Sequence, residues 1–405
     1  MRGAGPQGPA VRSTPLLESE TRMKTGKSIT ELALEIQRQA DAKRDFLVST
    51  QDLEITTGLR YEGSELKPTA PQLVVAGAEG LAPLDIGPTA HQQIATEAGI
   101  PKPYYDRMLA EQPELLARNV NTWFKAKPQR RMVRALDNRA RALVSDKFRR
   151  LDNIELAEAA LPALLESGMD IVSSEITERK LYIKAVDRSV QRFLPVGARI
   201  GDGGHAGYKI PNGEVVPAIQ ISNSEIGDGT LSVVGGYLDG GCTNLMWWWK
   251  TSGMKKYHVG ARADLGDELY KILTDETKSA TDKALWLQFR DTVKAALSTE
   301  VFDERLAAIE ATLRNEIVGD PVKVVEVTAK RFSLTEGQRG SVLQHLIRGG
   351  QLNQFGLANA VTSMANDQED YDAASGFEAL GGRIIELPKH EWKVLSEGRE
   401  LLKAA

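Results

Sequence analysis

Apolar residues in the first third of the chain recur at intervals of three and four, which is the spacing of amphipathic helices. Ser28 and Glu31 stand at the two positions of a capping box, which predicts a helix over residues 28–44. Helix-starting prolines recur further along, and Gly99 stands where a glycine commonly ends a helix. The pattern therefore predicts a short array of helices over residues 89–126.

Residues 45–86 are mixed, with short strand-like runs such as QLVVAG, and longer strand-like patterns follow the helical array. The segments RRMVRAL and RARALVS flank the turn signal at residues 137–138, which predicts a β-hairpin. Residues 169–260 combine strand-like runs with glycines, whereas residues 264–316 and about 322–375 return to helical spacing. The tail at residues 381–392 is assigned one further strand.

These elements predict an α+β protein with a central antiparallel sheet and helical N-terminal and C-terminal parts. We divide the chain into a disordered extension over residues 1–24, an α+β core domain over residues 25–320 and a C-terminal helical region over residues 321–405. The extension is rich in glycine and proline and lacks the apolar stretch of a signal peptide. Met23 then opens a segment that resembles an ordinary start.

Composition and charge narrow the class of protein only in part. The chain has 405 residues, a formal net charge of −4 and one cysteine, Cys242. A single thiol excludes an intrachain disulfide and a multi-cysteine metal site, which fits a reducing cytoplasm. The chain contains no run of about 18 apolar residues, the length that a membrane span requires. We therefore expect a cytoplasmic protein with no membrane partner.

The chain lacks the sequence motifs of common catalytic and cofactor sites. Its five histidines are too far apart for a local metal-ligand pair, and the glycine-rich segment 201–211 is not followed by the helix of a dinucleotide site. The polar residues at 223–228 fit either a turn between strands or a ligand-facing cluster. We expect no catalytic residue, no metal and no cofactor, and an enzyme is the less favoured class.

The strongest chemical signal is a basic stretch beside aromatic residues. From Lys125 to Arg150, ten residues are Lys or Arg and two are acidic. A second cationic segment follows the three tryptophans at residues 247–249. Single-stranded nucleic acid binds where cations meet phosphates and rings stack on bases. A solvated basic face beside core tryptophans is the alternative interpretation. The predicted nucleic-acid contacts are Trp123, Phe124, Lys125, Lys127, Arg130, Arg131, Arg134, Arg139, Arg141, Lys147, Arg149, Arg150, Trp248, Lys250, Lys255 and Lys256.

Five segments, in order, resemble a known family over most of residues 25–382. They are GIPKPYYDRM, ARNVNTWF, RALVSDKFRRLDN, ISNSEIGDGTLSV followed by GGCTN, and GLANAVTSMAND. The chain resembles the phage- and plasmid-borne "phage/plasmid-like protein" family, a domain of unknown function. Leu245 stands where that family usually has a glycine, so the turn before it is expected to differ. The resemblance implies a role in phage or plasmid DNA metabolism.

The central strands followed by a long helix are also similar to the core of single-strand annealing recombinases. By this analogy of fold, residues 218–225, 230–238 and 243–250 are sheet strands, and residues 264–297 form a helix across them. Such recombinases work as rings or filaments and need no metal or nucleotide. The analogy therefore implies a homo-oligomer.

We expect a mobile-element protein that binds single-stranded DNA and takes part in strand annealing during recombination or replication. Two alternatives stand beside this expectation. The first is an enzyme acting on nucleic acid or nucleotide, with a pocket built from residues 201–207 and 223–228. The second is a protein-binding factor that inhibits a host system, in which the basic stretch meets an acidic partner.

Overall fold

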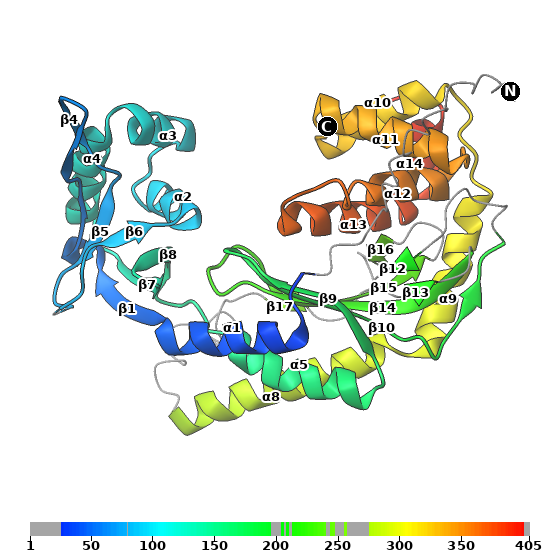
Figure 1. The fold of residues 1–405 in the computed structure, drawn as a ribbon, viewed down its shortest axis with the longest axis horizontal. Helices are drawn as coiled ribbons and strands as arrows, with labels where there is room; N and C mark the ends of the chain where they lie inside the picture. Colours follow the sequence, from blue (N-terminus) through cyan, green and yellow to red (C-terminus); the bar gives the residue numbers. More distant parts are fainter. Residues whose placement is uncertain are drawn as a thin grey trace, which may run out of the picture.

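The computed structural model describes residues 26–78, 80–195, 204–205, 208–209, 213–239, 244–247, 255–256 and 275–400. The predicted extension at residues 1–24 lies outside the described residues, as do Cys242, Trp248 and Lys250. The described part is built from two main β-sheets with helices packed around them (Figure 1). The predicted α+β class, with helical N-terminal and C-terminal parts, is confirmed.

The first sheet, sheet B, forms an N-terminal lobe with three helices, shown at the left of Figure 1. Its strand order is β1-β7-β8-β6-β5-β2, and all neighbours are antiparallel except β6 and β8. The strands are β1 (Arg44–Ser49), β2 (Leu53–Thr56), β5 (Gln72–Val75), β6 (Leu84–Ile86), β7 (Arg130–Leu136) and β8 (Arg139–Ser145). A 3-10 turn η1 (Thr50–Asp52) and the hairpin of β3 (Leu59–Glu62) and β4 (Glu65–Pro68) complete the strand connections, and the helices are α2 (Pro88–Glu97), α3 (Lys102–Glu111) and α4 (Pro113–Ala126).

The predicted hairpin is the pair β7–β8. Asp137 and Asn138 form its two-residue turn with φ angles of 50° and 60°. Positive φ at both turn positions matches the right-handed twist of the flanking strands, and Asp and Asn tolerate this conformation better than most residues. The hairpin prediction is therefore confirmed.

The second sheet, sheet A, is the central antiparallel sheet. Its main order is β16-β15-β14-β10-β9. The strands are β9 (Asp170–Ile176), β10 (Leu181–Val186), β14 (Glu214–Asn223), β15 (Leu231–Asp239) and β16 (Asn244–Trp247), with short additions from β11 (Arg192–Phe193) and β17 (Lys255–Lys256). A separate short pair joins β12 (Gly204–His205) to β13 (Tyr208–Lys209). All ten residues of β14 are buried, because helices cover both faces of the sheet.

Three helices cover one face of sheet A: α1 (Ile29–Ala42), α5 (Asn153–Glu166) and α8 (Asp275–Ala296). The capping box of Ser28 and Glu31 is present at the start of α1, as predicted. On α8, Leu285 and Phe289 share a hydrophobic cluster with Ile219 of β14 and with residues of α5. A long helix therefore crosses the central strands, and residues 264–274 of the predicted helix lie outside the described residues.

The C-terminal helices cover the other face. They are α9 (Thr299–Leu313), α10 (Pro321–Phe332), α11 (Glu336–Gly349), α12 (Gln354–Ser363), α13 (Tyr371–Ile385) and α14 (Lys389–Ser396). Residues 381–392 lie in α13, α14 and the link between them, so the predicted strand at this tail is wrong. Phe302 and Leu306 of α9 pack in the same hydrophobic cluster as residues of α10 to α14. Within the described range, none of the helices combines the length and apolar composition that crossing a bilayer requires.

A buried ion pair fixes α13 to sheet A. Lys184 Nζ of β10 lies 2.7 Å from Glu378 Oε2, and both side chains are buried. Trp247 Nε1 of β16 donates to the same carboxylate oxygen at 3.0 Å. The ammonium also lies 4.5 Å from the centroid of the Tyr371 ring. Because every charge has a partner, the contact fixes the helix at one position on the sheet.

Candidate nucleic-acid interface

The basic stretch occupies the end of α4, the β7–β8 hairpin and the chain that leaves β8. Strand pairing sends successive side chains to opposite faces of sheet B, so the ten cations do not share one surface. Some point outward, whereas others meet carboxylates from α2, β1, the N-cap of α5 and the loops of sheet A. The partners of each cation therefore decide which of them can meet an external ligand.

Arg134 lies at the centre of a buried polar network and cannot contact an external phosphate. Only 4% of its side chain is exposed. Its Nε donates to Asp45 Oδ1 at 3.0 Å, and its Nη2 donates to Asp152 Oδ1 at 2.7 Å. Its Nη1 donates to the backbone oxygen of Glu225 at 2.7 Å. The expectation that Arg134 neutralises a phosphate does not fit these contacts.

Four further arginines of the stretch also meet carboxylates. Arg131 lies 2.6 Å from Glu97, Arg139 lies 2.9 Å from Glu178, Arg141 lies 3.3 Å from Glu225 and Arg150 lies 3.7 Å from Asp45. The side chains of Arg131 and Arg141 are largely covered, whereas those of Arg139 and Arg150 are about half exposed. At least five of the ten cations between Lys125 and Arg150 therefore have internal ion-pair partners.

Phe124 is also unavailable for stacking on a base. It is 1% exposed and belongs to the core of the N-terminal lobe with Leu116 and Val120. These three residues recur every four positions along α4 and form its buried face. Trp123, one position earlier, points away from that face and is 47% exposed.

A small group of aromatic and basic residues remains open to solvent. We call Trp123, Lys125, Lys127 and Arg130 the Trp123 cluster. The three cations are exposed and form no ion pair with any residue that the structure describes. Lys127 Nζ lies 6.0 Å from the centroid of the Trp123 ring. Lys127 therefore places positive charge beside an exposed indole ring, and Lys125 and Arg130 add exposed charge close by along the chain.

Two more exposed cations lie at the same end of the hairpin. Arg131 pairs with Ser145 in the register of β7 and β8, so the chain leaves β8 beside the point where it enters β7. Lys147 and Arg150 follow on that departing chain and are exposed. Arg149 is half-buried. Lys255 and Lys256 form β17 beside β15 of sheet A.

Two polar residues of the segment 223–228, Asn223 and Glu225, hold neighbouring structure in place. Asn223 donates to the backbone oxygen of Leu151 at 2.8 Å and to Asn153 Oδ1 at 2.9 Å. Glu225 Oε1 accepts from the backbone nitrogen of Asn153 at 2.8 Å. Asn223 and Glu225 are both buried, and they hold the first turn of α5. The predicted enzymatic pocket is not built from these two residues, and the segment 201–207 is described only at residues 204–205.

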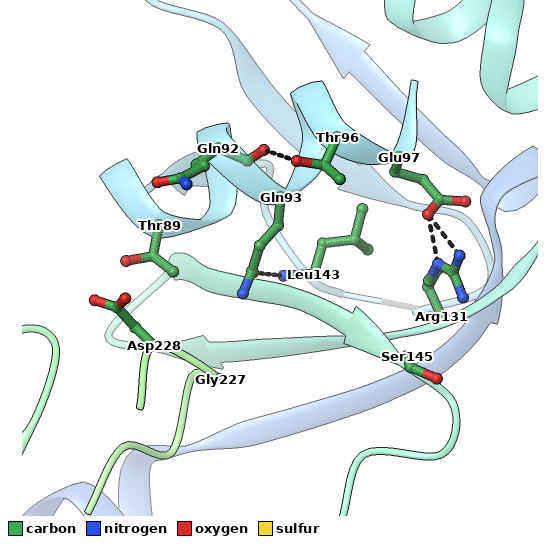
Figure 2. Close-up of a pocket in the computed structure, with 10 residues that line it drawn as sticks. All are labelled: Thr89, Gln92, Gln93, Thr96, Glu97, Arg131, Leu143, Ser145, Gly227 and Asp228. Atoms are coloured by element: carbon green, nitrogen blue, oxygen red, sulfur yellow. Dashed lines mark hydrogen bonds and ion pairs between the residues drawn. The ribbon is translucent and has the colours of Figure 1, made fainter. Parts of the chain in front are cut away.

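A polar pocket of about 310 Å³ does lie beside the hairpin, between α2, β8 and the loop after β14 (Figure 2). One face of α2 forms its longest wall, with Thr89, Gln92, Gln93, Thr96 and Glu97 at helical spacing. The opposite rim is the loop at residues 227–228. The sequence could have indicated this wall, because one face of α2 is polar at every turn. The sequence did not indicate which loop lies opposite that face.

The pocket is held open by its own contacts. Gln93 accepts from the backbone nitrogen of Leu143 at 2.7 Å and donates to the backbone oxygen of Ile226 at 2.9 Å. At one end Arg131 is paired with Glu97, and at the other Thr89 faces Asp228 (Figure 2). Gly227 has a φ angle of +76°, and a Cβ there would lie 3.2 Å from Val144 Cγ1. Glycine therefore permits the close approach of the loop to β8.

Within the described residues, no group of three or more His, Cys, Asp or Glu side chains is arranged to hold a metal ion. The burial of His91 in α2 lowers its pKa to about 4, and the charge of Lys102 acts in the same direction. His91 Nδ1 lies 2.8 Å from the Tyr105 hydroxyl inside the lobe, away from the pocket wall. It is therefore a core histidine.

No protein-family model, curated protein or solved structure matches this chain. The functional argument therefore depends on the geometry of the chain itself.

Proposed function

We propose that this protein binds single-stranded DNA through the Trp123 cluster. The observation that carries the proposal is an exposed indole ring with three exposed cations, none of which has a carboxylate partner among the described residues. Unpaired bases stack on such rings, and each stacked base contributes about 1–3 kcal/mol, while Lys and Arg meet the phosphates. Duplex bases are already stacked, so an exposed ring favours the single strand.

The surface extends from the Trp123 cluster toward Lys147 and Arg150 at the same end of the hairpin. This surface is much smaller than the stretch of ten cations in the sequence, because Arg131, Arg134, Arg139 and Arg141 meet carboxylates. Arg150 stays on the surface, since it is about half exposed and lies 3.7 Å from Asp45. Three to five phosphate contacts give only modest affinity for one protomer. A homo-oligomer would present several such surfaces to one strand and raise the affinity through effective concentration.

The biological role follows from the family resemblance rather than from this surface. A DNA-binding protein carried by a phage or plasmid acts in the cytoplasm of its host, and strand annealing in recombination or replication is the activity that we propose there. The analogy to annealing recombinases supplies that activity, and the strands of sheet A crossed by α8 are compatible with it.

The proposal is tested by fluorescence anisotropy with a labelled 20-nucleotide strand and its duplex. The triple variant Lys125→Ala, Lys127→Ala, Arg130→Ala removes the cations of the cluster. The matched control removes Lys102, Arg107 and Lys330, which are ion-paired elsewhere, and changes the net charge equally. We expect the first variant to bind single strands at least 10-fold more weakly, and the control to stay within twofold of the parent chain.

Replacement of Trp123 by Ala tests the strand selectivity separately. Loss of one stacked base is expected to weaken single-strand binding by about 5- to 150-fold, with a smaller effect on duplex. Equal affinities of the parent chain and the triple variant would contradict the proposed interface.

A further inference from the structure

The polar pocket beside the hairpin carries hydrogen-bonding groups that the fold does not use. Among the described residues, the Thr89 hydroxyl and the Gln92 side-chain amide have no hydrogen-bond partner. Glu97 uses only Oε2 to pair with Arg131, and Asp228 uses only Oδ2 to pair with Arg179. The pocket therefore offers free acceptors at both ends and a free amide on its long wall.

The charges of the lining favour a neutral ring over a phosphate. Two carboxylates, Glu97 and Asp228, line the pocket against one cation, Arg131, which is already paired with Glu97. Leu143 contributes an apolar surface between them. A volume of about 310 Å³ is at the small end of ligand pockets. These properties together fit a flat heterocycle with amino groups at its edge.

The pocket adjoins the proposed path of the DNA strand. Arg131 and Ser145 line it, and Arg130, next to Arg131, and Lys147, two residues after Ser145, are exposed. A strand whose phosphates follow Arg130 and Lys147 passes the rim of the pocket. A base can leave a single strand at lower cost than a duplex, because no pairing is lost.

We infer that this pocket receives one unstacked base of the bound strand and selects a base that carries an exocyclic amino group. Adenine, cytosine and guanine carry such a group, and carboxylates and Gln side chains recognise it, whereas thymine has no exocyclic amino group and presents the O4 acceptor in its place. Gln92 is the reading residue, because its amide can donate and accept at once. The inference rests on the proposed function, since the strand must first bind at the Trp123 cluster.

The test compares the affinities of dA, dC and dT 20-mers for the full chain at one salt concentration. We expect dA and dC to bind at least about fivefold more tightly than dT. This difference is at the lower end of the discrimination that a protein achieves through hydrogen bonds to one base. In the variant Gln92→Ala that preference should disappear, with unchanged affinity for dT. The control Gln344→Ala, at an exposed position of α11, should keep the preference.

The outcomes separate this inference from the proposed function. Equal affinities for the three strands, with the dependence on Lys125, Lys127 and Arg130 intact, would overturn the base pocket and leave the interface standing. A preference that persists in Gln92→Ala would also overturn it, since the preference would then arise from base stacking. Absence of binding to every strand would overturn the interface and the base pocket together.

Discussion

Arg134 Nη2 lies 2.7 Å from Asp152 Oδ1, and this contact joins the middle of β7 to the N-terminus of α5. Asp152 is also the N-cap residue of α5, where it forms a capping box with Glu155. The arginine at the centre of the basic stretch therefore ties the N-terminal lobe to the helices under sheet A. Its charge stabilises the arrangement of the two sheets and is not offered to a ligand.

The first prediction concerns this buried network. Arg134→Met keeps much of the apolar stem but removes the guanidinium that Asp45 and Asp152 share. Both carboxylates are largely covered, and only Asp152 keeps a close second cation, Lys43. The free energy of unfolding should fall by about 3–5 kcal/mol. Arg139→Met breaks an exposed pair with Glu178 on the same hairpin and should cost no more than about 1 kcal/mol. Urea denaturation of both variants measures the difference, and equal losses would show that the network does not stabilise the fold.

The second prediction concerns two glycines of α13 in different surroundings. A Cβ on Gly382 would lie 1.7 Å from the backbone oxygen of Trp247, whereas a Cβ on Gly376 would meet nothing within 4 Å. Gly382→Ala should therefore force α13 away from β16 and destabilise the protein by about 1–3 kcal/mol. Gly376→Ala should stabilise it by about 0.5–1 kcal/mol, because alanine favours the helix. Thermal unfolding of the two variants checks the opposite signs.

The third prediction is a loss of stability at mildly acidic pH. Burial, with a smaller contribution from Lys102, lowers the pKa of His91 to about 4, against about 6.5 for an unfolded histidine. Between these values the unfolded chain binds the proton more readily, so the free energy of unfolding falls as the pH decreases from about 6.5 to 4. Because water reaches part of the ring, we expect a contribution of about 1–2 kcal/mol.

Urea unfolding at pH 7.5 and 4.5 measures this fall, and His91→Gln should reduce it by that amount. His345→Gln is the control, because it removes a histidine that pairs with Asp367 at the surface of another part of the molecule. A fall that is the same in the parent chain and in His91→Gln would exclude His91 as its source.

Local signals predicted the elements well. The capping box at Ser28 and the Asp137–Asn138 turn depend on residues close in sequence, and both are present. The strand predicted at residues 381–392 was wrong because Gly381, Gly382 and Pro388 resemble the residues that commonly bound strands and turns. In the structure the two glycines lie inside α13, where a Cβ on Gly381 would lie 2.2 Å from Thr362 Cγ2. The glycines serve close packing, which no local pattern reveals.

The site was harder to predict because charge pairing is a long-range property. Arg134 meets Asp45 and the backbone of Glu225, which are 89 and 91 positions away. Counting the cations within one segment therefore does not show which of them have such distant partners. The sequence alone could have shown that Phe124 is buried and cannot stack on a base. Leu116, Val120 and Phe124 repeat at helical spacing, and Trp123 falls outside that face.

The salt dependence of single-strand binding tests the central claim most directly. Three to five phosphate contacts at the Trp123 cluster, Lys147 and Arg150 predict that log affinity falls with log salt at a slope of about −2 to −3.5. The triple variant at Lys125, Lys127 and Arg130 should bind with a slope that is shallower by about 2. A slope near zero for the parent chain, or the same slope in the triple variant, would contradict binding of DNA phosphates at this surface.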